Sequence, residues 1–510
     1  MKWRVNFTVP NCNFNLIGYA PGAFLRNVPQ KDNEPLLKEW YLEYSEGTVV
    51  AYVPVKDIEE TVGWIRDKII SDINWADELH KKAEDLNHIY FAYAKKVLDY
   101  DLKIISDNEL FELYKTLKDY QLSSHFWSIS TTWFLDSDGE VYSKYLKNEL
   151  QKYLESIGVK DKKKIIEYFI LLTTPFKENF VYEEQLDFLY LLKKIKSDQQ
   201  SKKILRRTSP NAQEIFNSLK SDIKDEINEY YKKWHWTPYG YIGPAYTLDY
   251  YIDEIRKQIM VINPDKLIKE EKERFSKIKK EQDKLMAEIK LPEKLEHLFA
   301  VAQDIIWLKD FRKYCIWHGH YVLDKLTFEI ARRFKISHKQ ANHLLVDEVK
   351  QIINNGEIDH NLINSRIDYC VMWSDGKTEK YYYGNEARKI ITDLDVEEIA
   401  INYEAGFQGT CACTGEVIGR VKIVNSLADI GKVADGDIML AHTTYPAMLP
   451  AMKKAGAIIT EDGGITCHAA IVSREFKIPC VVGVKHITRE LRDGDRVHVD
   501  AISGVITLLN

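Results

Sequence analysis

The chain has 510 residues, too many for one ordinary hydrophobic core, and this length predicts two to four domains. With 45% hydrophobic and 29% charged residues and a net charge of −6, the composition gives no sign of a nucleic-acid-binding face. No run of about 18 apolar residues predicts a membrane span, and the N-terminus lacks the apolar stretch of a signal peptide. Seven cysteines, an odd number, suit a reducing compartment, so we expect a cytoplasmic globular protein.

Residues 1–55 are expected to form an N-terminal extended or strand segment. Apolar residues alternate in Trp3–Val9 and Gly47–Val55, a pattern that is typical of strands. From Lys56 the apolar spacing changes to three and four residues, which predicts a helical domain over 56–390. Within it, Asp375-Gly376 lies between two β-prone runs and predicts a hairpin. The helices expected after residue 140 fall at about 141–158, 160–172, 182–197, 211–233, 246–260 and 264–290.

Glycine usage separates the last part of the chain from the rest. Residues 401–510 hold 12 of the 24 glycines. Dense glycine fits a small α/β domain with tight turns, whereas sparse glycine with many Lys, Glu and Leu residues fits helices. The predicted fold class is therefore multidomain α plus α/β, with a large, mostly helical N-terminal region and a C-terminal domain over 391–510.

Within the C-terminal domain, Thr460–Gly483 is predicted to form a glycine loop, a short helix and a buried strand. Gly463 and Gly464 leave the backbone open to close approach, and His468 stands in the first turn of the helix. An anion bound there would meet unpaired N–H donors and the positive end of the helix dipole. A neutral imidazole is also a competent nucleophile near pH 7. The local chemistry thus favours a phosphohistidine, and the alternative is a helix-starting histidine with a local role.

The sequence GGITCHAAIVSR, followed by REFKIPCVVG, resembles the signature of the PEP-utilising enzyme mobile domain. This swivelling phosphohistidine domain occurs in phosphoenolpyruvate synthase, pyruvate phosphate dikinase and rifampicin phosphotransferase. The likeness continues in Gly415–Val424, Gly436–Gly464 and Leu491–Ile506. It implies a swivelling β/β/α fold over 391–510 and a catalytic role for His468 as the phosphoryl carrier. The residue before it, Cys467, occupies a position where many relatives have Ser, and we interpret it as a small buried hydrophobe.

The resemblance also implies which neighbours of the histidine bind the phosphate or shape the loop. Thr466 would donate a hydroxyl hydrogen bond to the phosphate or the imidazole. Arg474 matches the signature, and it either reaches the phosphate or pairs with Glu461 or Glu475. The implied phosphate-binding and loop residues are Gly463, Gly464, Thr466 and Arg474.

Other parts of the family's machinery are not expected in this chain. In the family an ATP-grasp domain phosphorylates the histidine, yet the sequence has no P-loop and no glycine-rich ATP-grasp pattern. The PEP/pyruvate barrel is also not expected, since the chain stops at Asn510. We therefore expect a separately encoded ATP-grasp partner that binds most of the ATP and Mg²⁺ of the complete reaction. No metal site is predicted, because Cys411 and Cys413 have no second ligand pair at zinc-finger spacing.

The phosphoryl acceptor, a small molecule, would then bind in the helical domain. Aromatic residues gather in Ser123–Phe134 and Tyr230–Tyr246, although aromatics at helical spacing are more often core than pocket. A histidine could deprotonate a hydroxyl acceptor. The spacing of two puts His318 and His320 on different faces of a helix, so that at most one should point at a shared site. The acceptor-site candidates are Arg312, Lys313, His318 and His320.

Together these features predict a phosphotransferase component of the dikinase type, incomplete without its partner. Two alternatives stay open at this stage. One is a subunit of a split phosphoenolpyruvate synthase. The other is a non-catalytic regulatory or binding subunit that docks on an ATP-grasp protein.

Overall fold

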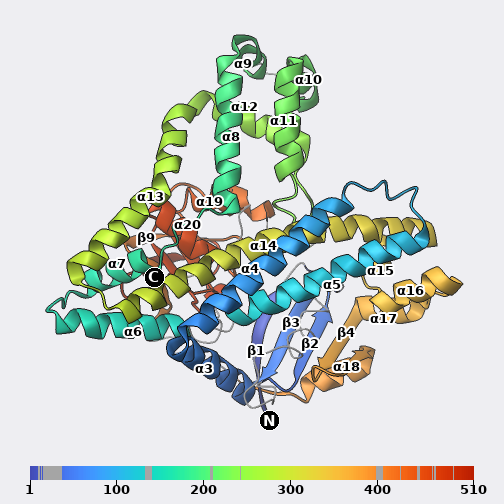
Figure 1. Cartoon of the computed structure of the whole chain (residues 1–510), viewed down its shortest axis with the longest axis horizontal. Coiled ribbons are helices and arrows are strands. Elements are labelled where there is room, and N and C mark those ends of the chain that lie inside the picture. Colours follow the sequence, from blue (N-terminus) through green and yellow to red (C-terminus); the bar gives the residue numbers. More distant parts are fainter. Residues whose placement is uncertain are drawn as a thin grey trace.

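The computed structural model describes residues 1–9, 12, 14, 37–132, 141–206, 211–241, 243–397, 406–425, 427–444, 448–461, 463–464, 467–485 and 487–509. A large, mostly helical region is followed by a β-rich C-terminal unit (Figure 1), which confirms the predicted fold class. None of the helices in these ranges is both long enough and apolar enough to span a bilayer.

The N-terminal strands belong to a six-stranded sheet that also takes in residues from 369 to 396. Its order is β5-β4-β2-β3-β1-β6. The β2 strand pairs antiparallel with both β3 and β4, and so joins the two distant segments. The expected hairpin lies between β4 and β5, where the Asp375 carboxylate accepts hydrogen bonds from the N–H groups of Lys377 and Thr378. The strands are β1 (Lys2–Val9), β2 (Trp40–Ser45), β3 (Thr48–Pro54), β4 (Tyr369–Ser374), β5 (Glu379–Tyr383) and β6 (Asp395–Val396).

One long helix, α14 (Glu293–Phe334), organises the helical region. Its 42 residues correspond to a length of about 63 Å. It packs against α4 (Ile73–Val97) and α5 (Asp107–Thr132), as Figure 1 shows. Gly319 of α14 lies against Tyr90 of α4, and an added Cβ would stand only 1.8 Å from the tyrosine hydroxyl. Glycine at this point therefore lets the two helices approach closely, and α14 is buried over most of its circumference.

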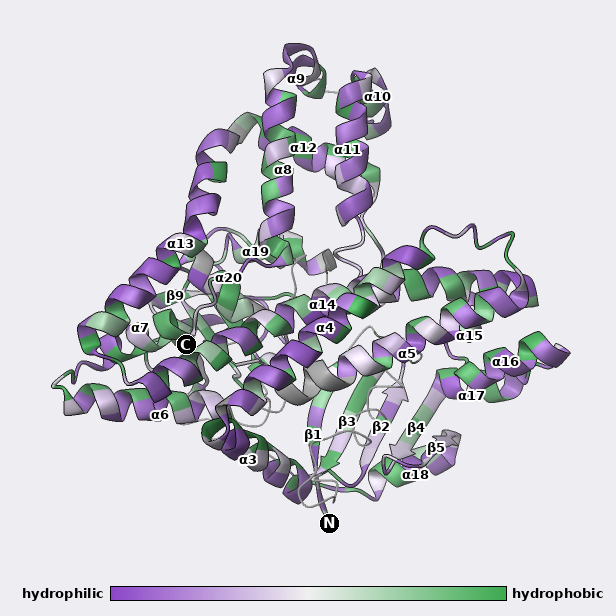
Figure 2. Ribbon diagram, in the orientation of Figure 1, coloured by the Kyte–Doolittle hydropathy of each residue, from purple (hydrophilic) through white to green (hydrophobic). Residues whose placement is uncertain are grey.

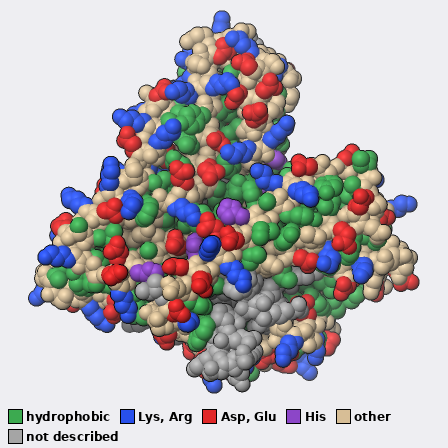
Figure 3. All heavy atoms as spheres, viewed as in Figure 1, with side chains coloured by type: hydrophobic (Ala, Val, Ile, Leu, Met, Phe, Trp, Pro, Cys, Tyr) green, Lys and Arg blue, Asp and Glu red, His purple; other side chains and the backbone are tan. Residues whose placement is uncertain are grey.

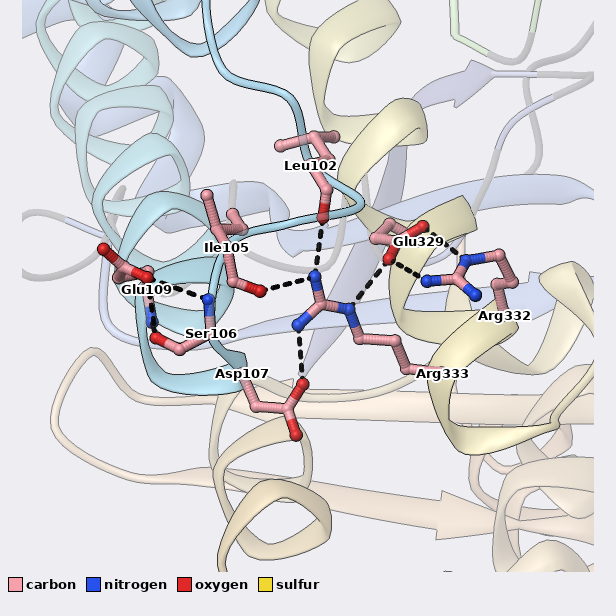
Figure 4. A network of polar contacts seen from close by, with 8 residues as sticks. All are labelled: Leu102, Ile105, Ser106, Asp107, Glu109, Glu329, Arg332 and Arg333. Atoms are coloured by element: carbon pink, nitrogen blue, oxygen red, sulfur yellow. Dashed lines mark hydrogen bonds and ion pairs between the residues drawn. The ribbon is translucent and has the colours of Figure 1, made fainter.

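A polar network fixes the C-terminal end of α14 against the turn between α4 and α5 (Figure 4). Arg333 donates hydrogen bonds to the carboxylates of Glu329 and Asp107, at 2.8 and 2.6 Å. It also donates to the carbonyl oxygens of Leu102 and Ile105, at 2.6 and 2.9 Å. The register of α14 against α5 is thus set by a largely buried arginine rather than by apolar contact alone.

Five helices form a lobe that projects from the body (Figure 1) and shares its core with the second half of α14. They are α8 (Phe180–Ser197), α9 (Gln199–Leu205), α10 (Ala212–Ser218), α11 (Ser221–Trp234) and α12 (Leu248–Val261). The stretch expected as one helix over 211–233 is two helices, because Leu219 and Lys220 adopt extended backbone angles.

The charged run after Pro264 forms a single helix, α13 (Pro264–Ile289), which leads back from the lobe and is hydrophilic along most of its length (Figure 2). On the face shown in Figure 3, cationic and anionic side chains are interspersed, in line with the small net charge. The other helices of the region are α3 (Val55–Ser71), α6 (Val141–Ser156), α7 (Lys162–Thr173), α15 (His338–Ala341), α16 (Val346–Asn355), α17 (His360–Asp368) and α18 (Gly384–Thr392).

The C-terminal unit is built on an eight-stranded sheet of order β7-β14-β13-β9-β10-β11-β12-β8. Its four central neighbours, β9 to β12, run parallel, and separate apolar clusters cover the two faces. The strands are β7 (Phe407–Gln408), β8 (Thr410–Cys413), β9 (Glu416–Ile423), β10 (Ile438–Ala441), β11 (Ala457–Thr460), β12 (Cys480–Val482), β13 (Arg496–Asp500) and β14 (Val505–Leu509). The helices are η2 (Leu427–Lys432), α19 (Leu449–Met452), α20 (His468–Phe476) and α21 (Ile487–Glu490).

Candidate functional site

The histidine loop lies at the carboxyl edge of the parallel strands, where α/β sheets commonly bind ligands. Ala441 at the end of β10 pairs with Thr460 at the end of β11, so the segments that follow both strands lie side by side. The chain then passes through Gly463 and Gly464 into α20, which begins at His468. The first turn of this helix directs its N–H groups toward the loop, and the helix dipole adds positive potential there.

Gly463 is required by both its backbone and its surroundings. Its φ is +110°, a value that side-chain-bearing residues rarely adopt. An added Cβ would also lie 2.8 Å from the Cβ of Cys467, too close for any real contact. Gly464 is buried, and its carbonyl accepts a 2.9 Å hydrogen bond from the Cys467 N–H. Thr466 lies outside the described residues, as does the side chain of His468.

A fixed negative charge stands beside the loop on Glu461, which directly follows β11. Its side chain is buried and accepts hydrogen bonds from the N–H (2.9 Å) and the hydroxyl group of Thr488. The Nδ1 atom of His442 lies 3.5 Å from the other carboxylate oxygen. Burial alone would raise the pKa of Glu461, but the hydrogen bonds from His442 and Thr488 outweigh it and lower the pKa to about 2. Sequence reasoning considered Glu461 only as a partner for Arg474.

Arg474 lies in the last turn of α20, and its Nε atom donates a 2.9 Å hydrogen bond to the carbonyl of Ala412 rather than to Glu461. Its two terminal nitrogens are buried and make no hydrogen bond within the described part of the chain. The side chain lies among the thiols of Cys413, Cys467 and Cys480, and burial lowers its pKa. The role of Arg474 in phosphate binding remains a prediction.

Two lysines of α14 lie within electrostatic reach of the start of α20. Burial raises the pKa of the Cys467 thiol, and Lys313 and Lys309 partly oppose this effect. Lys313 itself is buried enough for its pKa to be lowered, with Asp310 acting in the other direction. Burial raises the pKa of Asp310 to about 6, although both lysines lower it. The residue before His468 therefore lies within electrostatic reach of the helical region.

Two further candidates, Arg312 and His320, lie in a polar cluster between α14 and α5. The Nε atom of Arg312 is buried and makes no hydrogen bond within the described residues. His320 lies 3.0 Å through Nε2 from the amide nitrogen of Gln121 and 3.0 Å through Nδ1 from the carbonyl oxygen of Gly240. Burial lowers the pKa of His320 to about 3, and Lys118 contributes in the same direction. His320 is thus a neutral imidazole whose two nitrogens are both engaged.

His318 lies apart from this cluster, as the spacing of two predicts for the two histidines. Its ring centroid is 4.7 Å from those of Phe91 and of Trp236. Burial lowers its pKa to about 3, with Lys95 and His235 acting in the same direction. The structure therefore brings Arg312 and His320 into one cluster, with Lys313 nearer the start of α20 and His318 in an aromatic surrounding of its own.

Sequence reasoning missed two members of the polar cluster, Lys118 and His125 of α5. Burial lowers the pKa of Lys118 to about 7. Burial also lowers the pKa of His125 well below its usual value, and Arg312 and His320 lower it further. A signal was present, because Lys118, Gln121 and His125 recur at the three- and four-residue spacing of a buried helix face.

The comparisons with known proteins bear on the C-terminal unit. Residues 433–504 match the model of the family described as PEP-utilising enzyme, mobile domain. The matched residues lie within the C-terminal unit and include the histidine loop and α20. Within the part of the chain that the structure describes, no three His, Cys, Asp or Glu side chains are grouped so as to hold a metal ion.

Relatives of the mobile domain carry the name phosphoenolpyruvate synthase. The probable phosphoenolpyruvate synthase of Archaeoglobus fulgidus is 50% identical over 99 residues, which are 19% of this chain and 13% of that protein. The phosphoenolpyruvate synthase of Pyrococcus furiosus is 41% identical over 141 residues, 27% of this chain and 17% of that protein. The phosphoenolpyruvate synthase of Deinococcus radiodurans is 51% identical over 86 residues, which are 17% of this chain and 11% of that protein.

The chain thus spans less than a fifth of the length of these relatives. Among solved structures, the holo-form of aconitase X from Thermococcus kodakaraensis covers 20% of this chain and 98% of its own. The sequence identity is 20% and the TM-score is 0.17, values too low to indicate a shared fold. The mobile-domain match and the names of the relatives support a family of phosphohistidine-carrying phosphotransferases.

Proposed function

We propose that the protein is a phosphotransferase component that carries a phosphoryl group on His468 to a small-molecule acceptor held by the helical region. The observation that carries the proposal is that Cys467, next to His468, lies within electrostatic reach of Lys313 and Lys309 of α14. A phosphoryl group that left the histidine at this point would be attracted by these two cations.

The proposed chemistry depends on positioning and charge. Phosphoryl transfer spreads negative charge over the three peripheral oxygens, and cations that are already in place stabilise it without reorganisation. Lys313 and Lys309 supply such charge on the acceptor side. On the carrier side, the first turn of α20 supplies N–H donors and the positive end of a helix dipole.

The proposal includes a separate ATP-grasp protein that phosphorylates His468, with ATP and Mg²⁺ bound largely by that partner. ATP would supply the phosphoryl group, and Mg²⁺ would neutralise its oxygens in the loading step. The names of the relatives support a loading reaction of this kind. The seven free cysteines support placement of the protein in the cytoplasm.

A second candidate is a subunit of a split phosphoenolpyruvate synthase. It is favoured by the names of the relatives whose sequences match. The two candidates differ in their acceptor, since only the second requires pyruvate.

The experiment incubates the full chain with Mg²⁺, ATP labelled in its β- or γ-phosphate, and the ATP-grasp protein encoded nearest to it. We expect acid-labile label in the wild type and none in His468→Ala. The matched control is His498→Ala, because His498 is a partly exposed histidine of the same unit that pairs with a surface carboxylate, Glu416.

Three results separate the readings. Label that His468→Ala abolishes and His498→Ala retains supports the carrier. Wild-type protein that stays unlabelled contradicts it and favours the non-catalytic binding role. Release of the label as phosphoenolpyruvate when pyruvate is added assigns the protein to the second candidate.

A further inference from the structure

Two cysteines of the C-terminal unit stand directly opposite each other on neighbouring strands. Cys413 ends β8, and its Cα partner in the antiparallel pairing with β12 is Cys480, the first residue of that strand. Directly opposed residues of an antiparallel pair have Cα atoms about 4.5 or 5.5 Å apart, and disulfides span Cα separations of about 4.4–6.8 Å. The backbone is therefore already at the spacing that a disulfide needs.

The two side chains also lie on the same face of the sheet. Cys480 belongs to the apolar cluster that the sheet forms with α20, and Cys413 packs against that cluster. The next pair along the two strands is Cys411 and Val481, and Val481 belongs to the cluster on the opposite face. Since directly paired residues share a face, Cys411 is turned away from the Cys413–Cys480 pair.

A guanidinium group lies beside the pair. The Nε atom of Arg474 donates a 2.9 Å hydrogen bond to the carbonyl of Ala412, the residue before Cys413. Its two terminal nitrogens are buried and make no hydrogen bond among the described residues. Burial raises the pKa of the Cys413 thiol, and Arg474 acts against this effect. A negative charge on this sulfur, as a thiolate or a sulfenate, would therefore have a cationic neighbour with N–H donors to offer.

The two sulfurs differ in their access to solvent. Cys413 is half-buried, whereas Cys480 has an exposed fraction of 0%. An oxidant that arrives from solvent therefore meets Cys413 first, and Cys480 is placed to react with the oxidised sulfur. A third thiol, that of Cys467, packs against the same cluster but stands at the start of α20 and has no partner position on either strand.

We propose that Cys413 and Cys480 form a reversible disulfide when the protein meets a peroxide, and that this bond fastens β8 to the rest of the C-terminal unit. β8 has four residues and stands last in the sheet order, and among the described strands it pairs only with β12. A short edge strand held by few backbone hydrogen bonds opens easily, and a covalent link across it would oppose that opening. Disulfides that form in reducing compartments are usually transient and respond to oxidants in this way.

The oxidation takes place in two steps. The Cys413 sulfur attacks one oxygen of the peroxide, the O–O bond breaks, and Cys413 becomes a sulfenic acid while the other oxygen leaves with the thiol proton as water or an alcohol. The Cys480 sulfur then attacks the Cys413 sulfur, an S–S bond forms, and the sulfenic oxygen leaves as water with the Cys480 proton. The two thiols lose two electrons in all and the peroxide gains them, and a dithiol reductant reverses the change.

Peptide mapping of the full chain by mass spectrometry tests the linkage. Reduced protein is treated with an equimolar amount of hydrogen peroxide, the remaining thiols are alkylated in denaturant, and the peptides are compared before and after reduction. We expect a pair of peptides joined through Cys413 and Cys480, lighter by two hydrogen atoms than the separate thiol peptides and separated by reduction. A link from Cys467 to either residue, or a sulfinic acid on Cys413 without any link, would overturn the assignment.

Three variants test the part that each side chain plays. Cys480→Ser should prevent the link and leave a sulfenic acid on Cys413 that dimedone captures. The matched control, Cys411→Ser, removes a thiol from the other face of the same strand and should form the link at the wild-type rate. Arg474→Gln should slow formation of the link by about tenfold, as expected when the pKa of the attacking thiol rises by one unit. Equal rates in Arg474→Gln and the control would contradict the role of the guanidinium group, and the wild-type map decides the linkage by itself if a variant does not fold.

Hydrogen exchange of the oxidised and reduced wild type tests what the link does. Amides of β8 and β12 should exchange about tenfold or more slowly in the oxidised protein, because the link restricts the opened state, whereas amides of α5 should be unchanged. Equal exchange of β8 in the two forms would refute the fastening role. None of these measurements requires a phosphoryl group on His468, so their outcome is independent of the proposed function.

Discussion

Replacing Glu461 with glutamine tests how the strand end beside the histidine loop is held. The substitution keeps the size of the side chain and an oxygen that can accept from Thr488, but it removes the negative charge. In the wild type that charge is buried and receives hydrogen bonds from Thr488, with His442 3.5 Å away. Hydrogen bonds to a charged acceptor are about twice as strong as neutral ones, so the glutamine should hold Thr488 and His442 less firmly.

The size of the effect follows from the pKa of Glu461. Its fall from an ordinary value of 4.5 to about 2 corresponds to about 3 kcal/mol of stabilisation by the ionised form. Partial exposure of His442 screens some of this, so we expect a loss of about 2 kcal/mol at pH 7. Because the pKa is lowered in the folded state, the stabilisation is complete above about pH 4.5 and disappears as the pH falls toward 2.

The assay is hydrogen exchange of amides in β10 and β11, which reports opening of the C-terminal unit within the full chain. Glu461→Gln should reduce protection at pH 7, and its difference from the wild type should shrink between pH 4.5 and pH 2. The control is Glu416→Gln, whose carboxylate is 66% exposed and pairs with His498, a surface pair of small value. Equal losses in the two variants, or a loss that does not change with pH, would refute the reasoning.

The remaining predictions concern the loop and the end of α14. Gly463→Ala should slow labelling of His468 by about tenfold or more, because the φ of Gly463 is +110° and the new methyl group would meet Cys467. The control, Gly431→Ala, places its methyl group in open space and should not slow labelling. Equal labelling rates in the two variants would contradict this prediction. Arg333→Ala should lower the stability of the helical region by about 2–4 kcal/mol. Arg332→Ala should lower it by less than about 1 kcal/mol, because the Arg332 side chain is 53% exposed. Tryptophan fluorescence measures the unfolding of this region, since all 11 tryptophans precede residue 391. Hydrogen bonds from these arginines lower the pKa of Glu329 to about 2, so the stability that it confers should be lost from about pH 4.5 downward, and a flat acid profile would count against it.

The sequence predicted single elements of the fold better than their pairing. The strand expected at Trp3–Val9 is β1, and the hairpin at Asp375-Gly376 is present, because alternation and turn residues are local signals. The strand at Trp40–Ser45 falls within the segment expected to be extended or strand over 1–55, but it was not singled out, although it links the N-terminal strands to β4. Which strands share a sheet depends on contacts across more than 300 residues, and periodicity does not encode them.

The candidate site was predictable where the signal was a compact motif. The glycine loop and the start of the helix at His468 follow from a few consecutive residues with special backbone requirements. The polar cluster was harder to predict, because Lys118 and His125 come from α5 and Arg312 from α14, and only tertiary packing brings the two helices together. Polar residues at buried positions of α5 were the available clue, but their role depends on the charges that face them.

The measurement that tests the central claim most directly is a reversible disulfide trap between the mobile domain and α14. In the Lys313→Cys variant, mild oxidation should join the new thiol to Cys467, block labelling of His468 by the ATP-grasp partner, and release the block on reduction. Lys325→Cys, on an exposed position of the same helix, should neither crosslink to Cys467 nor change labelling. If Lys313→Cys does not form this disulfide, or if the trapped protein is still labelled at the normal rate, a carrier that moves between its partner and α14 is contradicted.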